Sequence, residues 1–368
     1  MTLRVAVVGL GWAARTIWLP RLVGHPGITV TAVVDPDPVA RASCATRAGN
    51  ARSLSSPDEL TPDLADLAVV AVPNHAHAPV ACGLLRRGIP VFLEKPVCLS
   101  TAEADDLAAA EAAGGAVLVA GSAARYRADV RALEELLPSL GRIRHVELAW
   151  VRSRGVPGTD WFTRRHAAGG GALVDLGWHL LDTALPLLGP VRIDQVAAVL
   201  GHDFVRHGDS QAVWREEHAR PADPGARDVE DTARAMLVTD SGVSVAVRAS
   251  WASHARYDTT VVEIHGTAGT AALRCTFGFS PNREGAASLT VHRDGDVGRV
   301  PLDEEPPGTE YDRQVADLAA LVGDPAQRGR AVAAARTTIG AIELIYDSAQ
   351  KASAGARNSE EEPAWTGN

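Results

Sequence analysis

Residues 3–14 read Leu-Arg-Val-Ala-Val-Val-Gly-Leu-Gly-Trp-Ala-Ala, and they give the strongest indication of the fold. An apolar strand-like run, Leu3–Val8, leads directly into a G-x-G-x-x-A turn that opens a helix, which is the context of the dinucleotide-binding fingerprint. Gly9 permits the tight turn, Gly11 lets the backbone approach a pyrophosphate at the helix start, and Ala14 allows close helix–strand packing. We therefore expect cofactor contacts from Gly9, Gly11, Trp12, Ala13 and Ala14.

An acidic residue ends the next apolar segment. Asp35 lies 21 residues after Ala14, where a carboxylate accepts hydrogen bonds from the adenosine ribose and repels a 2′-phosphate. The sequence therefore favours NAD over NADP. Asp35 also begins Asp35-Pro36-Asp37-Pro38, which is typical of a turn, so a purely local role is the alternative.

The first 120 residues alternate apolar strands with helices, which predicts an α/β, doubly wound parallel Rossmann sheet. The expected strands are Leu3–Val8, Thr29–Val34, Leu67–Ala71, Val91–Leu93 and Val117–Ala120. The expected helices are Ala13–Val23, Val39–Ala48, Ala78–Arg87 and Ala102–Ala112.

The later chain shows many strands and few helices, which predicts a C-terminal α+β domain with a large, mainly antiparallel open sheet. The expected strands are Arg144–Arg152, Val191–Leu200, Thr232–Val238, Val243–Ser250, Thr259–His265, Thr270–Cys275 and Ser288–Val291. The expected helices are Ala172–Leu188, Tyr311–Val322 and Arg330–Lys351. We expect a nucleotide-binding domain at 1–121, a substrate and oligomerisation domain at 122–352, a long loop at 201–230 and a disordered tail at 353–368.

Composition excludes several classes of function. The net charge of −9 and the absence of a basic run argue against nucleic-acid binding. No stretch approaches the roughly 20 apolar residues of a membrane span, and the apolar run at the N-terminus is too short for a signal peptide. The four cysteines are widely spaced, which favours a reduced, cytoplasmic protein without zinc or disulfides.

The third and fourth strands end in polar segments, Pro73-Asn74-His75-Ala76-His77 and Glu94-Lys95-Pro96. Ligands bind at the carboxyl ends of strands in open α/β sheets, so both segments are expected beside the cofactor. Lys95 is one of only two lysines among 36 Lys and Arg residues, and lysine, unlike arginine, can change its protonation state in a buried site. His75 and His77 have no further ligand nearby, so we expect no metal.

Asp175, His179 and Asp182 follow the triple glycine at 169–171 in an otherwise apolar helix. Residues four apart share one helix face, and buried polar groups need either partners or a task. A neutral histidine suits removal of a hydroxyl proton during hydride transfer, a lysine ammonium suits stabilisation of the developing alkoxide, and a carboxylate can orient either group.

Taken in order, these segments resemble the family of glucose–fructose oxidoreductase, inositol dehydrogenase and MocA proteins from about residue 3 to 350. The matching motifs are Gly9-x-Gly11-x-x-Ala14, Pro73-Asn74-x-x-His77, Glu94-Lys95-Pro96, Arg125-Tyr126, Gly141-Arg142-Ile143, Gly169-Gly170-Gly171, Asp175-x-Gly177-x-His179-x-x-Asp182, Glu230-Asp231-Thr232 and His265-Gly266-Thr267-x-Gly269.

The resemblance implies NAD(P)-dependent oxidation or reduction of a sugar, amino sugar or cyclitol hydroxyl by a homodimer or homotetramer that assembles through the C-terminal sheet. It implies a catalytic set of Lys95, Asp175 and His179. It also implies further cofactor contacts from Pro73, Asn74, His77, Glu94 and Lys95.

The segment 160–166 and the loop 201–230 depart from the family pattern, so they leave the substrate open. Candidate substrate contacts are Lys95, Arg125, Tyr126, Trp161, Arg164, Asp175 and His179. Trp161 and Tyr126 could stack on a sugar ring or simply pack in the core, and Arg164 could bind an anion or stay solvated. Asp160, Asp182 or Glu230 could receive an amino group.

Three functions therefore remain open. The leading hypothesis is an NAD-dependent dehydrogenase acting on a secondary hydroxyl, with a biosynthetic role for the resulting keto-sugar. The alternatives are an NAD-dependent redox-assisted glycoside hydrolase and a non-catalytic NAD or sugar sensor. Intact Lys95 and His179 argue against the sensor, which has no need to keep both.

Overall fold

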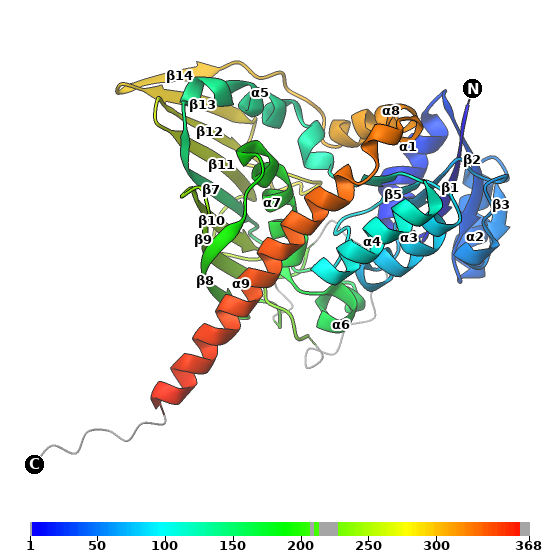
Figure 1. Ribbon diagram of the computed structural model, residues 1–368, viewed down its shortest axis with the longest axis horizontal. Coiled ribbons are helices and arrows are strands. Elements are labelled where there is room, and N and C mark those ends of the chain that lie inside the picture. The colour runs from blue at the N-terminus through cyan, green and yellow to red at the C-terminus, as the bar shows by residue number, and fades with distance from the viewer. Residues whose placement is uncertain (1, 207–209, 213–226, 361–368) are drawn as a thin grey trace, which may run out of the picture.

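The computed structural model describes residues 2–206, 210–212 and 227–360 of the 368-residue chain. Two sheets face one another across a layer of helices (Figure 1). The smaller sheet belongs to the N-terminal part of the chain, and the larger one forms the opposite side of the molecule.

The smaller sheet is parallel throughout, in the order β3-β2-β1-β4-β5-β6. This order, with helices on both faces, confirms the predicted Rossmann arrangement. The strands are β1 (Leu3–Val8), β2 (Ile28–Val34), β3 (Arg52–Leu54), β4 (Leu67–Val70), β5 (Val91–Leu93) and β6 (Leu118–Ala120). The helices are η1 (Ala14–Trp18), α1 (Leu19–Gly24), α2 (Pro38–Arg47), η2 (Pro57–Glu59), η3 (Asn74–Ala76), α3 (His77–Arg86) and α4 (Thr101–Gly114).

Local signals account for most of these boundaries. The Ser100 hydroxyl accepts a hydrogen bond from the Glu103 amide at the start of α4, and Gly115 ends that helix in a left-handed conformation at φ 65°. The edge strand β3 was not predicted, because three residues of which two are polar carry no strand pattern.

The larger sheet has the order β14-β13-β12-β11-β7-β10-β9-β8. Only the β7–β10 pair is parallel, so the prediction of a mainly antiparallel sheet is confirmed. Its strands are β7 (Ile143–Val151), β8 (Ile193–Gly201), β9 (Thr232–Thr239), β10 (Ser244–Ser250), β11 (Thr259–Gly266), β12 (Thr270–Cys275), β13 (Ser288–Arg293) and β14 (Asp296–Val300). The exposed edge strand β14 was not predicted, because it has no buried face to leave an apolar alternation.

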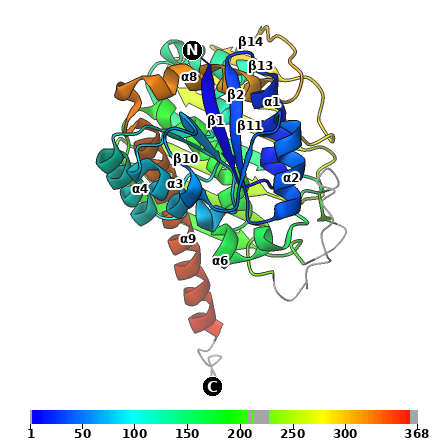
Figure 2. The same ribbon diagram turned by 90° about the vertical axis from the view of Figure 1, so that its right-hand side faces the viewer.

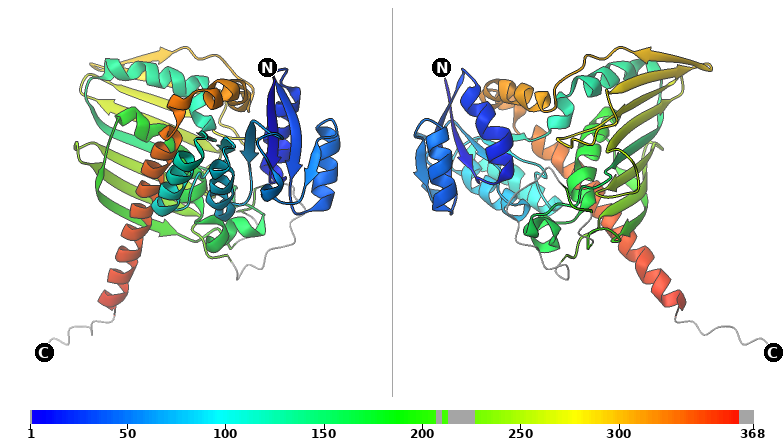
Figure 3. Two further views of the ribbon diagram at one scale, coloured as in Figure 1. Left: turned by 45° about the vertical axis from the view of Figure 1, so that its right-hand side comes forward. Right: turned by 180° about the vertical axis from the view of Figure 1, so that it is seen from behind.

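Helices cover one face of this sheet and leave the other open (Figure 3). On β7, Val146, Leu148 and Trp150 are buried beneath the helices, whereas Glu147 is exposed on the opposite face. The helical segments of this half are η4 (Ala123–Tyr126), α5 (Ala128–Leu136), η5 (Leu137–Leu140), η6 (Asp160–Thr163), α6 (Arg165–Ala168), η7 (Leu173–Gly177), α7 (Trp178–Ala184) and η8 (Leu185–Leu188).

The end of the chain returns to the nucleotide-binding half through α8 (Thr309–Gly323), η11 (Pro325–Gln327) and α9 (Arg330–Glu360). Val315 and Leu318 of α8 join the apolar cluster that contains Val5 and Val7 of β1. Helix α9 crosses the middle of the molecule and its far end projects from the body (Figure 2). These contacts tie the two sheets together.

Two predicted irregular segments differ from expectation or lie partly outside the described residues. Helix α9 continues to Glu360, so the tail predicted from residue 353 is helical over its first part. Ala352 and Ala354 favour continuation of the helix, and residues 361–368 lie outside the description. Of the predicted loop 201–230, the segments 207–209 and 213–226 are also outside it.

Candidate active site

One cavity of about 600 Å³ is lined by residues of both halves of the chain. It runs from the glycine-rich turn to the ends of β5 and β7 and to the helical segment after residue 172. The predicted site residues that line it are Gly9, Gly11, Trp12, Ala13, Asp35, Pro73, Asn74, His77, Glu94, Lys95, Trp161, Asp175 and His179. Ala14 lies below the cavity in the core, as its packing role requires.

The glycine-rich turn fits a pyrophosphate. Gly9 has a φ of 83°, and a Cβ there would lie 2.7 Å from the Ala71 carbonyl oxygen, so only glycine is accommodated. A Cβ on Gly11 would meet no atom within 4 Å, which leaves its backbone open to a ligand. The helical run begins at the next residue, Trp12, and directs its amide groups toward that space. The cradle therefore suits a bound dinucleotide.

Asp35 has a local role as well as a place on the cavity. Its Oδ2 accepts a hydrogen bond from the Leu10 amide at 2.8 Å, and its Oδ1 accepts one from the Asp37 amide at 2.9 Å. The carboxylate thus ties the glycine-rich turn to the end of β2 while facing the cavity. The sequence left open whether Asp35 stabilises the local turn or contacts the cofactor. Its position allows both.

The segment after β4 is anchored to the other half of the molecule. Asn74 donates a hydrogen bond through Nδ2 to the Ala168 carbonyl at 2.9 Å, and the His75 ring lies 3.3 Å from the Ala167 carbonyl. Asn74 is buried and also lines the cavity. These contacts fix the position of helix α6 relative to the nucleotide-binding sheet.

His77 is buried between two backbone carbonyls. Its Nδ1 lies 2.6 Å from the Pro96 oxygen and its Nε2 lies 2.9 Å from the Val72 oxygen. Burial is the main reason that the pKa of His77 falls to about 4, although the two carbonyls oppose that change. His77 therefore holds together the segments that follow β4 and β5.

Glu94 connects the glycine-rich helix to the segment that carries Lys95. Its Oε1 accepts a hydrogen bond from the Trp18 indole at 2.7 Å, and its Oε2 accepts one from the Lys95 amide at 2.8 Å. The buried carboxylate thus orients the backbone of Lys95 from the cofactor side.

Lys95 and Asp175 form a close ion pair on the cavity wall. The Lys95 Nζ lies 2.6 Å from the Asp175 Oδ1, and the Trp251 indole donates to the Asp175 Oδ2 at 2.9 Å. The Lys95 side chain is 17% exposed and that of Asp175 is 5% exposed. Both carboxylate oxygens are therefore engaged, and Asp175 holds the ammonium group in place at the cavity wall.

His179 lies on the same wall, four residues after Asp175. Its ring is 5.4 Å from the Trp150 ring, measured between centroids. Burial, followed by the positive charge of Lys95, lowers the pKa of His179 to about 3, while Asp175 opposes that shift. The imidazole is consequently neutral at ordinary pH.

The helical segment that carries Asp175 and His179 is held at its start by Glu230. Its Oε1 accepts hydrogen bonds from the Gly171 amide at 2.9 Å, the Leu173 amide at 3.0 Å and the Tyr346 hydroxyl at 2.9 Å. A Cβ on Gly171 would lie 1.8 Å from the Glu230 carbonyl oxygen, so this glycine is required for the close approach.

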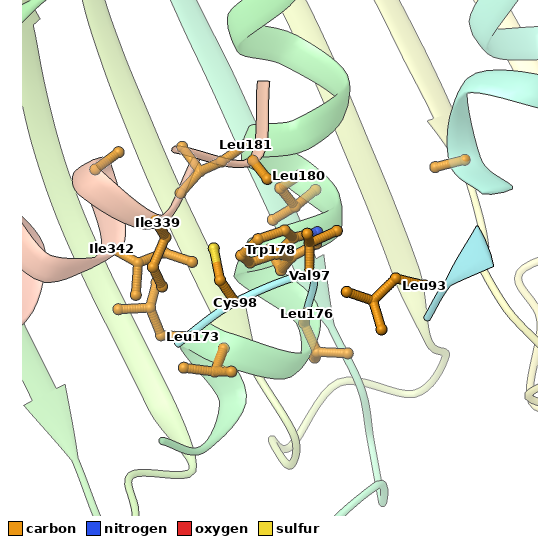
Figure 4. Close-up of a cluster of buried hydrophobic side chains, with 14 of the residues drawn as sticks. Leu93, Val97, Cys98, Leu173, Leu176, Trp178, Leu180, Leu181, Ile339 and Ile342 are labelled. Carbon is orange, nitrogen blue, oxygen red and sulfur yellow. The ribbon is translucent and has the colours of Figure 1, made fainter. Parts of the chain in front are cut away.

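An apolar cluster joins the Lys95 segment to the His179 helix (Figure 4). Val97 and Cys98, just after Lys95, share it with Leu176 and Trp178. Further members come from β5, η7, α7 and α9; they are Leu93, Leu173, Leu180, Leu181, Ile339 and Ile342. The distance between Lys95 and the helix is therefore set by packing as well as by the ion pair.

Three predicted substrate contacts do not line the cavity. The Arg125 guanidinium is 2.6 Å from the buried Asp182 carboxylate, and Arg164 is 2.6 Å from Asp160. Tyr126 packs beneath the guanidinium of Arg131. The Arg125–Asp182 pair was not visible in the sequence, because 57 residues separate the two partners. Arg164 and Asp160 are only four residues apart, so their spacing was a local signal that the sequence analysis did not use. Trp161 does line the cavity.

The residues suggested as receptors for an amino group do not line this cavity. Asp160 and Asp182 are paired with arginines, and Glu230 is buried below the helix start. Within the described residues, no group of three or more His, Cys, Asp or Glu side chains is arranged to hold a metal ion.

Several residues that line the cavity were missed in the sequence. Trp150 and Arg152 lie at the end of β7, while Phe277, Phe279 and Tyr311 cover the cofactor side from distant segments. The end of a strand is a general signal for a ligand site only in parallel sheets, so nothing local distinguished these residues.

The chain matches two family descriptions. Residues 3–122 match the oxidoreductase family with an NAD-binding Rossmann fold, and residues 130–272 match the GFO/IDH/MocA C-terminal domain. No helix among the described residues is long and apolar enough to cross a membrane.

Known relatives cover nearly the whole chain. A protein of Amycolatopsis mediterranei, provisionally named a UDP-kanosamine synthase oxidoreductase subunit, is 57% identical over 96% of this chain and 97% of its own. The dTDP-3,4-didehydro-2,6-dideoxy-alpha-D-glucose 3-reductase of Streptomyces antibioticus is 29% identical over 87% of this chain and 88% of its own. The crystal structure of GenD2 from gentamicin A biosynthesis in complex with NAD is similar at a TM-score of 0.73 and 29% identity, covering 95% of this chain and 94% of that one. The protein therefore belongs to the GFO/IDH/MocA family of NAD-binding oxidoreductases.

Proposed function

We propose that this protein oxidises a secondary hydroxyl of a nucleotide-linked hexose with NAD. The observation that carries the proposal is the single cavity lined both by the glycine-rich turn and by Lys95, Asp175 and His179. A hydroxyl placed beside these three side chains also lies beside the place that the fold provides for a nicotinamide.

The roles of the side chains follow from their geometry and charge. The Lys95 ammonium, held by Asp175, donates a hydrogen bond to the substrate oxygen and stabilises negative charge that develops on it. The neutral His179 ring accepts the hydroxyl proton. NAD, held by Gly9, Gly11 and Asp35, supplies the acceptor for the hydride that leaves the carbon.

We propose the 3-hydroxyl of UDP-glucose as the substrate group. Kanosamine is 3-amino-3-deoxyglucose, so a ketone at carbon 3 is the oxidation state from which its amino group is introduced. The 57% identity to the A. mediterranei protein supports this choice. The name of the S. antibioticus relative also specifies position 3 of a nucleotide-linked sugar.

NAD is the proposed cofactor, rather than NADP. The Asp35 carboxylate faces the cavity at the end of β2 and is held there by the Leu10 amide. Its negative charge opposes a 2′-phosphate at this place. GenD2, at 29% identity, was crystallised with NAD, which supports the same preference.

We also propose a homodimer or homotetramer formed through the open face of the larger sheet. The supporting feature is exposed apolar surface on that face, where Val199 is 67% and Met236 is 42% exposed. Sedimentation velocity should give a particle of two or four chains. A monomer at micromolar concentration would contradict the proposal.

We propose separate roles for the two parts of the chain. Residues 1–121 hold the cofactor, and residues 122–352 hold the substrate and the partner contacts, as supported by the two family descriptions that adjoin between 122 and 130. The four cysteines are free and buried, which supports a reduced compartment such as the cytoplasm.

The test incubates the protein with NAD and one compound from a panel, and follows the absorbance of reduced nicotinamide. The panel contains UDP-glucose, other nucleotide sugars, free glucosides and myo-inositol. The proposal predicts turnover with UDP-glucose and a product ketone at carbon 3, identified by reduction with borodeuteride and NMR. Turnover only with sugars that carry no nucleotide would contradict the substrate assignment. Absence of turnover with every compound of the panel and with both NAD and NADP would contradict the proposed dehydrogenase function.

A further inference from the structure

Three aromatic side chains from distant parts of the chain meet on one side of the cavity, namely Trp12, Phe279 and Tyr311. Phe279 stacks on Tyr311, with ring centroids 5.2 Å apart and ring planes inclined by 16°. Trp12 meets Phe279 edge-on, with centroids 6.0 Å apart. Stacked and edge-to-face pairs are favourable arrangements of aromatic rings. These three residues are called the aromatic wall below.

The aromatic wall extends from the glycine-rich turn toward the segment that carries Lys95. Trp12 belongs to that turn, and Tyr311 meets the Trp18 ring edge-on at 5.5 Å. The Trp18 indole donates to Glu94, which also holds the Lys95 amide. A dinucleotide places its pyrophosphate at the glycine-rich turn, and its nicotinamide reacts beside Lys95 in the proposed function. The wall therefore borders the nicotinamide half of the cofactor.

Phe279 is held in place by its own segment, which follows β12. The Arg283 guanidinium donates to the Thr276 carbonyl at 2.8 Å and to the Gly278 carbonyl at 2.9 Å. Gly278 has a φ of 72°, which a glycine adopts without strain. The backbone on the N-terminal side of Phe279 is thus fastened, and the ring has a defined place in the wall.

Tyr311 is fastened to the nucleotide-binding half by Arg21 of α1. The Arg21 guanidinium lies 5.5 Å from the centroid of the Tyr311 ring and 2.9 Å from the Asp312 carboxylate. It also donates to the Gly308 carbonyl at 3.2 Å. A Cβ on Gly308 would lie 2.6 Å from the Arg21 Nη2 and 3.2 Å from the Phe279 ring. Close packing of the start of α8 against the wall therefore requires glycine at 308.

We propose that the aromatic wall is a cofactor-binding surface for the nicotinamide half of NAD, and that Phe279 limits the rate at which the cofactor leaves. Phe279 and Tyr311 lie outside residues 3–122, the part that matches the NAD-binding Rossmann family, so both halves of the chain bind the dinucleotide. Phe279 contacts both other rings, and its removal breaks the wall. The inference rests on the cofactor's place in the proposed function, but not on the substrate.

The test measures the Kd of NADH and of ADP by calorimetry, and the dissociation rate of NADH by stopped-flow fluorescence, all without substrate. ADP carries the adenosine and the pyrophosphate but lacks the nicotinamide half, so it reaches the glycine-rich turn without needing the wall. Phe279→Ala should raise the Kd and the dissociation rate of NADH by about tenfold each, because apolar contact with the nicotinamide half is lost. The Kd of ADP should stay within about twofold of the wild-type value.

Phe204→Ala is the matched control. Phe204 is a partly buried phenylalanine of the same half of the chain that does not line the cavity, so both Kd values should remain those of the wild type. Tyr311→Phe keeps the ring and removes only the hydroxyl group. It should also keep the wild-type Kd of NADH, because the proposal assigns the contact to the ring.

An unchanged Kd and dissociation rate for NADH in a folded Phe279→Ala protein overturn the proposal. An equal loss of affinity for ADP also overturns it, because the change would then act on the glycine-rich turn. Equal weakening of NADH in Phe204→Ala, or marked weakening in Tyr311→Phe, does the same.

If Phe279→Ala fails to fold, Phe279→Leu removes the ring while keeping an apolar side chain, and the comparison is repeated with it. Weaker NADH binding with unchanged ADP binding supports the wall even if no compound is turned over, and such a result would count against the proposed dehydrogenase function alone. A wild-type protein that binds neither NADH nor ADP contradicts both the cofactor assignment and the wall.

Discussion

At the residue scale, the proposed reaction depends on Lys95, one of only two lysines in the sequence. Lys95 reaches Asp175 through a short ion pair and faces the cavity. Lysine offers a compact ammonium that can share proton transfer, whereas arginine stays charged. The other lysine, Lys351, is exposed on α9, which provides a matched control.

Replacement of Lys95 by alanine should lower kcat by about 10²- to 10⁴-fold, because a hydrogen-bond donor to the developing alkoxide is lost. Steady-state kinetics and NAD binding by fluorescence quenching measure the effect, and NAD binding should be little changed. Lys351→Ala should retain wild-type kinetics. Restoration of full activity in Lys95→Arg would show that a fixed positive charge suffices and would contradict the assigned role.

The proposed preference for NAD over NADP also rests on a single residue, Asp35. Asp35→Ser should raise the ratio of kcat/KM for NADP to that for NAD by about tenfold or more, because repulsion of the 2′-phosphate is removed. The variant should also lose about 1 kcal/mol of stability, because the Leu10 amide loses a charged acceptor.

Asp37→Ser is the matched control for this change. It removes the same charge two residues away and leaves a serine able to cap α2. Its cofactor ratio should remain that of the wild type. An equal change of the ratio in both variants would attribute the effect to net charge near β2 and not to the position of Asp35.

At the element scale, the helix that carries Asp175 and His179 has its place set by its first turn. Glu230 accepts hydrogen bonds from the Gly171 and Leu173 amides, which satisfies amide groups that a helix start leaves unpaired. Glycine at 171 permits this approach. The sequence showed the glycines as a motif but did not show what approaches them.

Gly171→Ala should destabilise the protein by about 2–3 kcal/mol and reduce kcat, because its methyl group would overlap the Glu230 backbone and displace the helix. Urea denaturation and kinetics measure the two effects. Gly83→Ala is the control, since its methyl group meets nothing within 4 Å in α3. That control should gain about 0.5–1 kcal/mol. Equal effects of both changes would rule out the steric explanation.

At the scale of the whole molecule, the buried histidines couple stability to pH. Burial lowers the pKa of His77 to about 4, while the unfolded chain has an ordinary histidine. Between these values the unfolded state binds more protons than the folded state, so stability falls as the pH drops below about 6.5. The effect belongs to the assembled molecule, because His77 becomes buried only when two strand-end segments meet around it.

The free energy of unfolding should be about 2 kcal/mol lower at pH 5 than at pH 7 through His77 alone. Urea denaturation at both pH values measures it, and His77→Gln should reduce the difference. His292→Gln, at an exposed position on β13, should leave it unchanged. The opposite sign, with greater stability at pH 5, would show that the two carbonyls favour the protonated ring more than burial disfavours it.

The sequence by itself determined the Rossmann sheet, the antiparallel character of the second sheet and the family. Strand and helix periodicity, together with glycines at fixed spacing, report local backbone requirements that need no knowledge of distant contacts. These patterns did not predict β3 and β14. Strand β3 has only three residues and β14 is almost wholly exposed, so neither shows an alternation of buried and exposed residues.

The sequence did not show that Arg125 lies away from the cavity or that Arg152 and Trp150 line it. Arg125 is paired with Asp182, which lies 57 residues further along the chain. Arg152 and Trp150 reach the site from β7, a strand with no distinguishing motif. Pairing and burial depend on side chains brought together from distant parts of the chain, and local spacing does not encode these contacts. The return of α8 and α9 to the first sheet has the same origin, because it is driven by burial of apolar surface between distant segments.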